Sequence, residues 1–327
     1  MKGDALRPNG IFLRVIIGGL LALLLAGVSP AHAALRALIV SGDPGSEKDF
    51  AIRFDDWRTR WQKLLTANYE FPAANVRVLN VPATAAKPAD LATRENVLAQ
   101  CAQLVKDSTD KDQVVLVLIG HAYHAQGEIG KFALAQAHLT DADLGLALRD
   151  LKARQFVCFY MAPAGESFAR ALAGANRVTI IANTKQSTPA FGEFLLRALA
   201  KPNVNLLDAF NQSSLQTTLW YQNQFSASGG KVGSMTVHGK EFQEIFHRLY
   251  PSRNMEPGKD DPQPPVNDPG AYDAWMGRRV IAEIAGLDDN GDGEVSTTFD
   301  DGKMPKPVPN KESKDGALAK TFFLGKN

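Results

Sequence analysis

One histidine lies directly after a predicted strand, at the position where α/β sheets place catalytic side chains. His121 follows Gly120 directly after the apolar run 114–119, and a second apolar run, 156–161, is followed by Ala162. Parallel strands of open α/β folds build their sites at the carboxyl ends of the strands. A histidine there can act as the base that takes a proton from a nucleophile, while backbone N–H groups bind the oxyanion. The alternative is a histidine that caps a loop.

An aspartate-rich turn near the C-terminus is a second candidate site. Asp288, Asn290 and Asp292 have the spacing of the first three ligands of a calcium loop, with Gly293 at the sharp turn. The twelfth place, where a bidentate glutamate belongs, is Phe299, and the glycine and prolines that follow forbid the exiting helix. The turn therefore predicts either weak calcium binding or a solvated acidic loop, and no other cofactor is expected.

Alternating strand and helix patterns provide the elements that would position His121. Apolar runs predict strands at 35–40, 76–79, 114–119, 156–161 and 178–182. Amphipathic spacing predicts helices near 50–65, 91–105, 141–151, 166–173 and 191–200. This order is typical of a mostly parallel sheet in a three-layer αβα fold. The stretch 127–139 is too short for a crossover helix and predicts a small hairpin beside the histidine.

The first 33 residues have the pattern of a secretory signal peptide. Lys2, Arg7 and Arg14 precede the apolar stretch 15–28, and a small-x-small pattern ends at Ala33. The apolar stretch is shorter than the roughly 20 residues that span a bilayer. We therefore expect cleavage after Ala33 rather than an uncleaved anchor, with no stable membrane insertion afterwards, and a periplasmic or secreted location.

Composition and charge limit the classes of function. With 45% hydrophobic and 22% charged residues, the chain is globular rather than disordered. A formal net charge of +1 gives no electrostatic basis for binding nucleic acid or an anionic membrane. The two cysteines, Cys101 and Cys158, fall on a helix face and within a strand, so we expect buried free thiols, although an oxidising compartment would permit pairing.

Beyond the alternating region the sequence predicts an extension. A long helix through Trp220 is followed by a turn near 226–230, by a helix at 240–249 and by a proline-rich linker, with a further helix at 275–284. We accordingly divide the chain into a signal peptide (1–33), the α/β domain (34–225), a helical extension (226–250), the linker (251–270) and a C-terminal segment with the aspartate-rich turn (271–327).

Five short motifs carry a family resemblance. LIVSG, LIGH, K-F-x-L, LTDADL and a V-x-I-x-A strand occur in this order over about 35–215. In that order they resemble bacterial exported homologues of legumain, in the caspase/legumain-type (C13-like, clan CD) cysteine peptidases. The resemblance implies that His121 occupies the place of the catalytic histidine and Ala162 the place of the cysteine nucleophile. A slip of one residue would put Met161 or Pro163 there, and none of the three can attack a carbonyl.

Neighbouring residues do not replace the nucleophile in this interpretation. Cys158 is four residues before Ala162, roughly 13 Å down the strand at about 3.3 Å per residue, and Ser167 is expected in the first turn of a helix. The resemblance also implies a substrate-binding role for two sets of residues: Gly120 and Ala122 beside the histidine, and Asn183 and Lys185 in a pocket loop.

The expected function is that of a pseudoenzyme. The resemblance implies an exported caspase/legumain-like domain that has lost peptidase activity and binds or scaffolds a protein or peptide partner. Two alternatives remain open: an active hydrolase that uses another nucleophile, and a purely structural protein of the cell envelope. If the resemblance to caspase/legumain-like domains holds, the side chains of His121 and Ala162 should face one shallow cleft.

Overall fold

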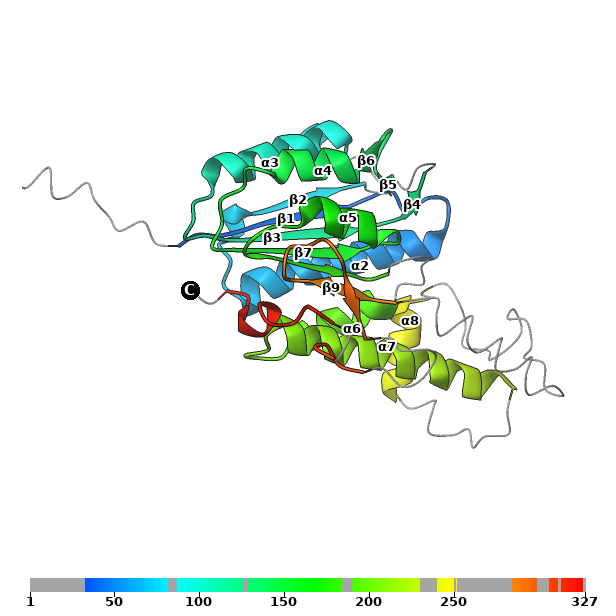
Figure 1. The fold of residues 1–327 in the computed structure, drawn as a ribbon. Coiled ribbons are helices and arrows are strands. Elements are labelled where there is room, and N and C mark those ends of the chain that lie inside the picture. The colour runs from blue at the N-terminus through cyan, green and yellow to red at the C-terminus, as the bar shows by residue number, and fades with distance from the viewer. Residues whose placement is uncertain are drawn as a thin grey trace, which may run out of the picture. The chain divides into compact units, whose positions relative to one another are not determined.

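A seven-stranded sheet forms the centre of the fold (Figure 1). The computed structural model describes residues 33–81, 87–125, 129–183, 190–229, 240–249, 251, 284–298, 306–310 and 313–325. The strand order is β10-β9-β8-β7-β3-β1-β2. The strands are β1 (Leu35–Ser41), β2 (Val76–Asn80), β3 (Gln113–Ile119), β7 (Gln155–Met161), β8 (Arg177–Ile181), β9 (Gly286–Asp288) and β10 (Ser296–Thr297). The first five are parallel, as their apolar sequences predict.

Helices cover both faces of the sheet, which confirms the three-layer αβα arrangement (Figure 1). One face packs against α3 (Arg94–Asp107), α4 (Asp141–Leu148) and α5 (Gly165–Leu172). The other packs against α2 (Lys48–Lys63), α6 (Ala190–Leu199), α7 (Leu206–Gly229) and α8 (Lys240–Leu249). Alternate residues of β3 face the two layers, so every residue of the strand is buried and its sequence is apolar from Val114 to Ile119.

Short elements complete the chain. A π-helical turn (Leu64–Asn68) continues α2, and 3-10 turns occur at Ala73–Asn75, Pro88–Asp90 and Ala319–Thr321. The stretch beside the histidine forms a three-stranded antiparallel sheet of β4 (Ala122–His124), β5 (Gly130–Ala133) and β6 (His138–Thr140). The predicted hairpin is thus present, with one strand more than expected, because Ala122, Phe132 and Leu139 pair across it and are all buried.

The C-terminal segment is part of the α/β domain, which corrects our division of the chain. The described residues from Ala34 onward belong to one compact unit. Strand β9 pairs antiparallel with β8, and the buried Gln113 side chain donates to the Phe323 carbonyl and accepts from the Gly325 N–H. Helix α7 also runs on to Gly229, past the boundary expected at residue 225. Most of the predicted linker and the helix expected at 275–284 lie outside the described residues.

Candidate functional site

The carboxyl ends of β3 and β7 lie side by side, as the sequence predicts. The two strands are parallel neighbours, and Ile119 pairs with Met161 at their last positions. His121 therefore follows one strand and Ala162 the other at the same edge of the sheet. This is the edge at which open α/β folds place their sites.

A backbone carbonyl fixes the orientation of the His121 ring. Nε2 of His121 lies 3.1 Å from the carbonyl oxygen of Pro44, in the loop after β1. A carbonyl oxygen only accepts, so Nε2 carries the proton and donates it, which leaves the lone pair on Nδ1 in the neutral ring. The Asp43 side chain accepts from the Gly45 N–H at 2.9 Å, and this local turn holds the Pro44 carbonyl in place.

Aromatic packing keeps this histidine neutral. The rings of Phe50 and Phe54, both on α2, meet the His121 ring edge-on at centroid distances of 4.4 and 5.2 Å. Burial lowers the pKa of His121 below its ordinary value, although the Pro44 carbonyl and the carboxylates of Glu47 and Asp43 act in the opposite direction. A neutral, oriented imidazole with a free acceptor nitrogen is what a general base requires.

The structure corrects our expectation that the side chains of His121 and Ala162 face one cleft. Ala162 is 4% exposed and packs in the apolar cluster under α5, whereas His121 packs against α2 on the opposite face of the sheet. The pleat explains this, because successive residues of a strand face opposite sides of the sheet. The register pairs Ile119 with Met161, and its continuation by two residues pairs His121 with Pro163. Pro163 is also half-exposed, as His121 is. In the register continued past the strand ends, Pro163 rather than Ala162 is therefore level with His121.

Proline at this position removes two chemical functions together. Its side chain has no nucleophilic atom, and its nitrogen has no hydrogen, so this residue supplies no backbone donor for an oxyanion. The next residue, Ala164, has φ 57° and ψ 36°, a left-handed conformation that is uncommon for a residue with a Cβ. The turn into α5 is thus sharply bent, but its three residues carry only hydrocarbon side chains.

Neither rescue candidate reaches the histidine. Cys158 is completely buried inside β7, and Ser167 is 7% exposed on the α5 side of the sheet. The Ser167 hydroxyl donates to the Ala164 carbonyl at 3.4 Å. The thiols of Cys101 and Cys158 are both free and buried, as expected, and burial raises the pKa of Cys101 to about 12.

The residues expected to bind substrate are largely enclosed. Gly120 and Ala122 are buried against the small sheet, and a Cβ on Gly120 would lie 2.8 Å from the Phe132 ring. Asn183 is 1% exposed, its carbonyl accepts from the Gly165 N–H, and its side-chain oxygen lies 3.5 Å from the Ile284 nitrogen. Asn183 thus ties α5 to the chain entering β9. Lys185 lies outside the described residues.

Sequence reasoning missed the groups that hold the histidine. The Pro44 carbonyl is a backbone atom and has no side-chain signature, so only the loop geometry reveals it. The amphipathic spacing predicts Phe50 and Phe54 on a helix face that packs against the core, and both do so. Their additional contact with the His121 ring follows from the short loop between β1 and α2, which has no sequence signal of its own.

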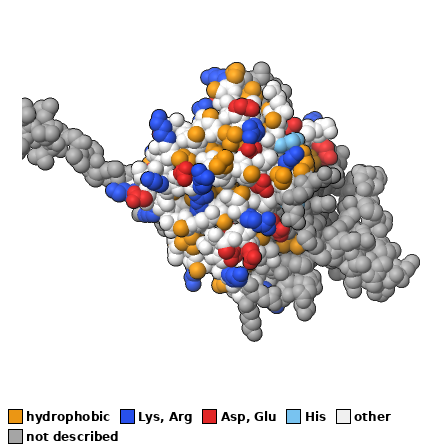
Figure 2. Space-filling view, turned by 45° about the horizontal axis from the view of Figure 1, so that its top comes forward, with side chains coloured by type: hydrophobic (Ala, Val, Ile, Leu, Met, Phe, Trp, Pro, Cys, Tyr) orange, Lys and Arg blue, Asp and Glu red, His pale blue; other side chains and the backbone are white. Residues whose placement is uncertain are grey.

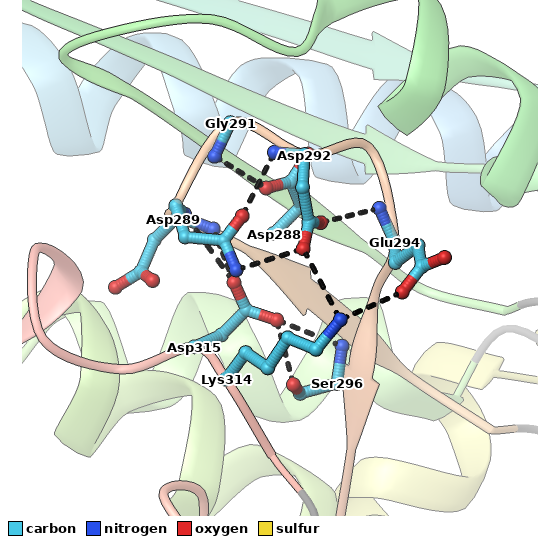
Figure 3. A network of polar contacts seen from close by, with 9 residues as sticks. Asp288, Asp289, Gly291, Asp292, Glu294, Ser296, Lys314 and Asp315 are labelled. Carbon is cyan, nitrogen blue, oxygen red and sulfur yellow. Dashed lines mark hydrogen bonds and ion pairs between the residues drawn. The ribbon is translucent and has the colours of Figure 1, made fainter.

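The side chains of the aspartate-rich turn bond mainly to the turn itself (Figure 3). Asp288 accepts from the Gly291 N–H and Asp292 from the Glu294 N–H, while the Asn290 side chain bonds to Asp292. Burial raises the pKa of Asp288 to about 6. Over the residues that the structure describes, no cluster of three or more His, Cys, Asp or Glu side chains is arranged to hold a metal ion.

Two buried aspartates join this turn to the end of the chain. The Asp289 carboxylate accepts from the N–H groups of Gly316 and Ala319 at 2.9 and 2.7 Å. The Asp315 carboxylate accepts from the Asp289 N–H at 3.0 Å and from the Ser296 hydroxyl at 2.6 Å (Figure 3). The acidic residues of this region therefore fasten the C-terminal segment to β9 and β10.

The surface carries charges of both signs. On the face seen in Figure 2, acidic and basic side chains are interspersed with hydrophobic ones. Within the described residues, no helix combines the length and the apolarity that crossing a membrane would need.

None of the protein-family models matches the sequence, and no curated protein matches it either. Among solved structures, protein GSU0716 from Geobacter sulfurreducens is similar at 15% sequence identity with a TM-score of 0.41. The match covers 56% of this chain and 89% of that one.

Proposed function

We propose that the protein is an exported caspase/legumain-like module that has lost peptidase chemistry and binds a protein or peptide partner. The proposal places it in the periplasm or outside the cell, in keeping with the signal-peptide pattern of its first 33 residues. In this proposal the fold keeps the frame of a hydrolase that uses a nucleophile and a histidine. The group that is missing is the nucleophile.

One piece of geometry carries the proposal: His121 is well oriented, and the β3–β7 register continued past the strand ends puts a proline level with it. A base is oriented by the groups that contact it. His121 has a hydrogen bond to the Pro44 carbonyl and contacts with two aromatic rings. Its neighbour Pro163 has neither a nucleophilic atom nor an N–H group. A frame that keeps the base and lacks the nucleophile supports loss of catalysis more strongly than either feature alone.

The same geometry supports binding of a peptide at this edge. Nδ1 of His121 is an acceptor in the neutral ring, and a peptide N–H is a donor of matching polarity. Phe50 is half-buried beside it and offers apolar surface for a side chain. These groups suit an extended peptide that is held but not cut.

The decisive experiment measures cleavage and binding on the same protein. The mature chain should cleave no member of a fluorogenic peptide library, while ring resonances of His121 in NMR spectra should shift on titration with the peptides that bind. His121→Phe should weaken that binding without changing the fold, with Tyr123→Phe as a matched control on the exposed small sheet. Turnover by the native chain that disappears in His121→Phe would show an active hydrolase and refute the proposal.

A further inference from the structure

The first residue after the predicted cleavage point lies against a buried carboxylate. The backbone nitrogen of Ala34 is 2.7 Å from Oδ1 of Asp112, which is 3% exposed. The Ala34 carbonyl also accepts from the Gln113 N–H at 2.9 Å. Ala34 is therefore held on both sides at the amino end of β1, at the opposite edge of the sheet from His121.

The carboxylate of Asp112 is only partly compensated by charge. Oδ2 of Asp112 accepts from the Thr109 N–H at 3.0 Å, and Nε of Arg36 lies 3.5 Å from it. That separation is an ion pair without a hydrogen bond, and Nε of Arg36 has no hydrogen-bond partner among the described residues. A buried carboxylate in this state gains from a further positive charge at hydrogen-bond distance.

We propose that removal of the signal peptide after Ala33 creates a buried ion pair between the new α-ammonium group of Ala34 and Asp112. Hydrolysis of the Ala33–Ala34 peptide bond adds one water, leaving a carboxylate on the released segment and an ammonium on Ala34. The neutral amide that donates to Asp112 in the precursor thus becomes a cation in the same place. Asp112 makes the mature chain more stable than its precursor, so processing and completion of the fold are linked.

This inference rests on the predicted cleavage point and is independent of the proposed binding function. Its structural support is the hydrogen bond of the Ala34 nitrogen to Asp112. Arg36 on β1 and Arg154 before β7 both contact Asp112, the latter through its backbone N–H, which donates to the Asp112 carbonyl. Asp110 and Lys111 directly precede Asp112 in the sequence.

The first test is the N-terminus of the exported protein, determined by intact mass and N-terminal sequencing. A start at Ala34 is expected, and a start at any other residue overturns the proposal. The second test compares two purified chains that begin at Ala34 and at Ala33. The longer chain keeps the Ala34 N–H but moves the ammonium by about 3.8 Å. We expect its unfolding equilibrium constant to be about tenfold larger, equivalent to about 1.4 kcal/mol.

Asp112→Asn in both chains completes a double-mutant cycle. The unfolding equilibrium constants of the chains that begin at Ala34 and at Ala33 should then agree within about twofold, because asparagine keeps an acceptor but loses the charge. Equal stability of the two native-sequence chains, or a difference that survives Asp112→Asn, would overturn the ion pair. If the variant does not fold, the α-amino pKa of the Ala34 chain decides: a value about one unit above 7.7–8.0 supports the pair, and an ordinary or lower value overturns it.

Discussion

Placing a thiol at position 163 tests whether His121 is still poised as a base. Continued two places past Ile119 and Met161, the β3–β7 register puts this position level with His121, and paired residues of neighbouring strands lie about 4.8 Å apart. Nδ1 of His121 can then take the thiol proton, and the imidazolium stabilises the thiolate. We expect the thiol of Pro163→Cys to have a pKa near 6.5 instead of about 8.5, a difference of about 2.7 kcal/mol.

The pH dependence of alkylation by iodoacetamide measures this pKa. At pH 7 the thiolate fraction should rise from about 3% to about 75%. The native thiols do not interfere, because Cys101 and Cys158 are completely buried. Ala162→Cys is the matched control, since its side chain faces the apolar cluster that contains Tyr160 and Phe168, where burial should raise the thiol pKa.

Three outcomes would refute this reasoning. An ordinary pKa in Pro163→Cys would mean that His121 is not poised. A depressed pKa in Ala162→Cys would mean that the extended register is wrong and that Ala162 is the residue beside the histidine. A depressed pKa in Pro163→Cys that persists after His121→Phe is added would assign the effect to another group.

Further predictions concern the polar contacts that hold the domain together. Glu193→Ala should lower the free energy of unfolding by about 2 kcal/mol in urea titrations, because it removes a fully buried carboxylate from two arginines, and Glu193→Gln should lose less. Asp289→Ala should cost about 2–4 kcal/mol and speed proteolysis of the C-terminal segment, since it leaves the N–H groups of Gly316 and Ala319 unpaired; unchanged proteolysis would contradict this. The raised pKa of Asp288 means that the folded state keeps a proton that the unfolded chain loses near pH 4, so stability should fall as pH rises from about 4 to about 6, by up to about 2.7 kcal/mol, and Asp288→Asn should flatten that interval. Millimolar calcium should stabilise the native chain by less than about 2.7 kcal/mol, the value that corresponds to 100 times the dissociation constant; a larger shift in thermal unfolding would show a strong calcium site.

The main sheet could be predicted from the sequence because its strands are buried on both faces. Runs such as 114–119 and 156–161 contain no charged residue. The second leads directly to α5, and the first reaches α4 through the small sheet of β4, β5 and β6. Strand β9, with the sequence Gly286-Leu287-Asp288, has neither length nor alternation, so its pairing with β8 has no local signal. Such a strand is specified by tertiary contacts, including those of Leu287 in the core.

The candidate site could be predicted only in part, and the pleat explains why. Sequence placed His121 and Ala162 at neighbouring strand ends, which the pairing of β3 with β7 bears out. Successive side chains of a strand point to opposite faces of the sheet. A shift of one residue in the alignment therefore moves a side chain to the other face. Motif spacing that tolerates a slip of one residue therefore cannot choose between Ala162 and Pro163, whereas the register of the sheet can.

The late closure of the sheet sets the order in which this chain can fold. Gln113 bonds to Phe323 and Gly325, which are 210 and 212 residues away along the chain, and the outer edge of β8 is covered only by β9. A chain that emerges from its N-terminus first must therefore wait with an open strand edge and with a Gln113 side chain that lacks two of its hydrogen-bond partners. Open edges are templates for pairing with other chains, and contacts this distant form slowly. Shortening the chain at its C-terminus would then yield an aggregating protein, because the edge of β8 that β9 covers would stay open.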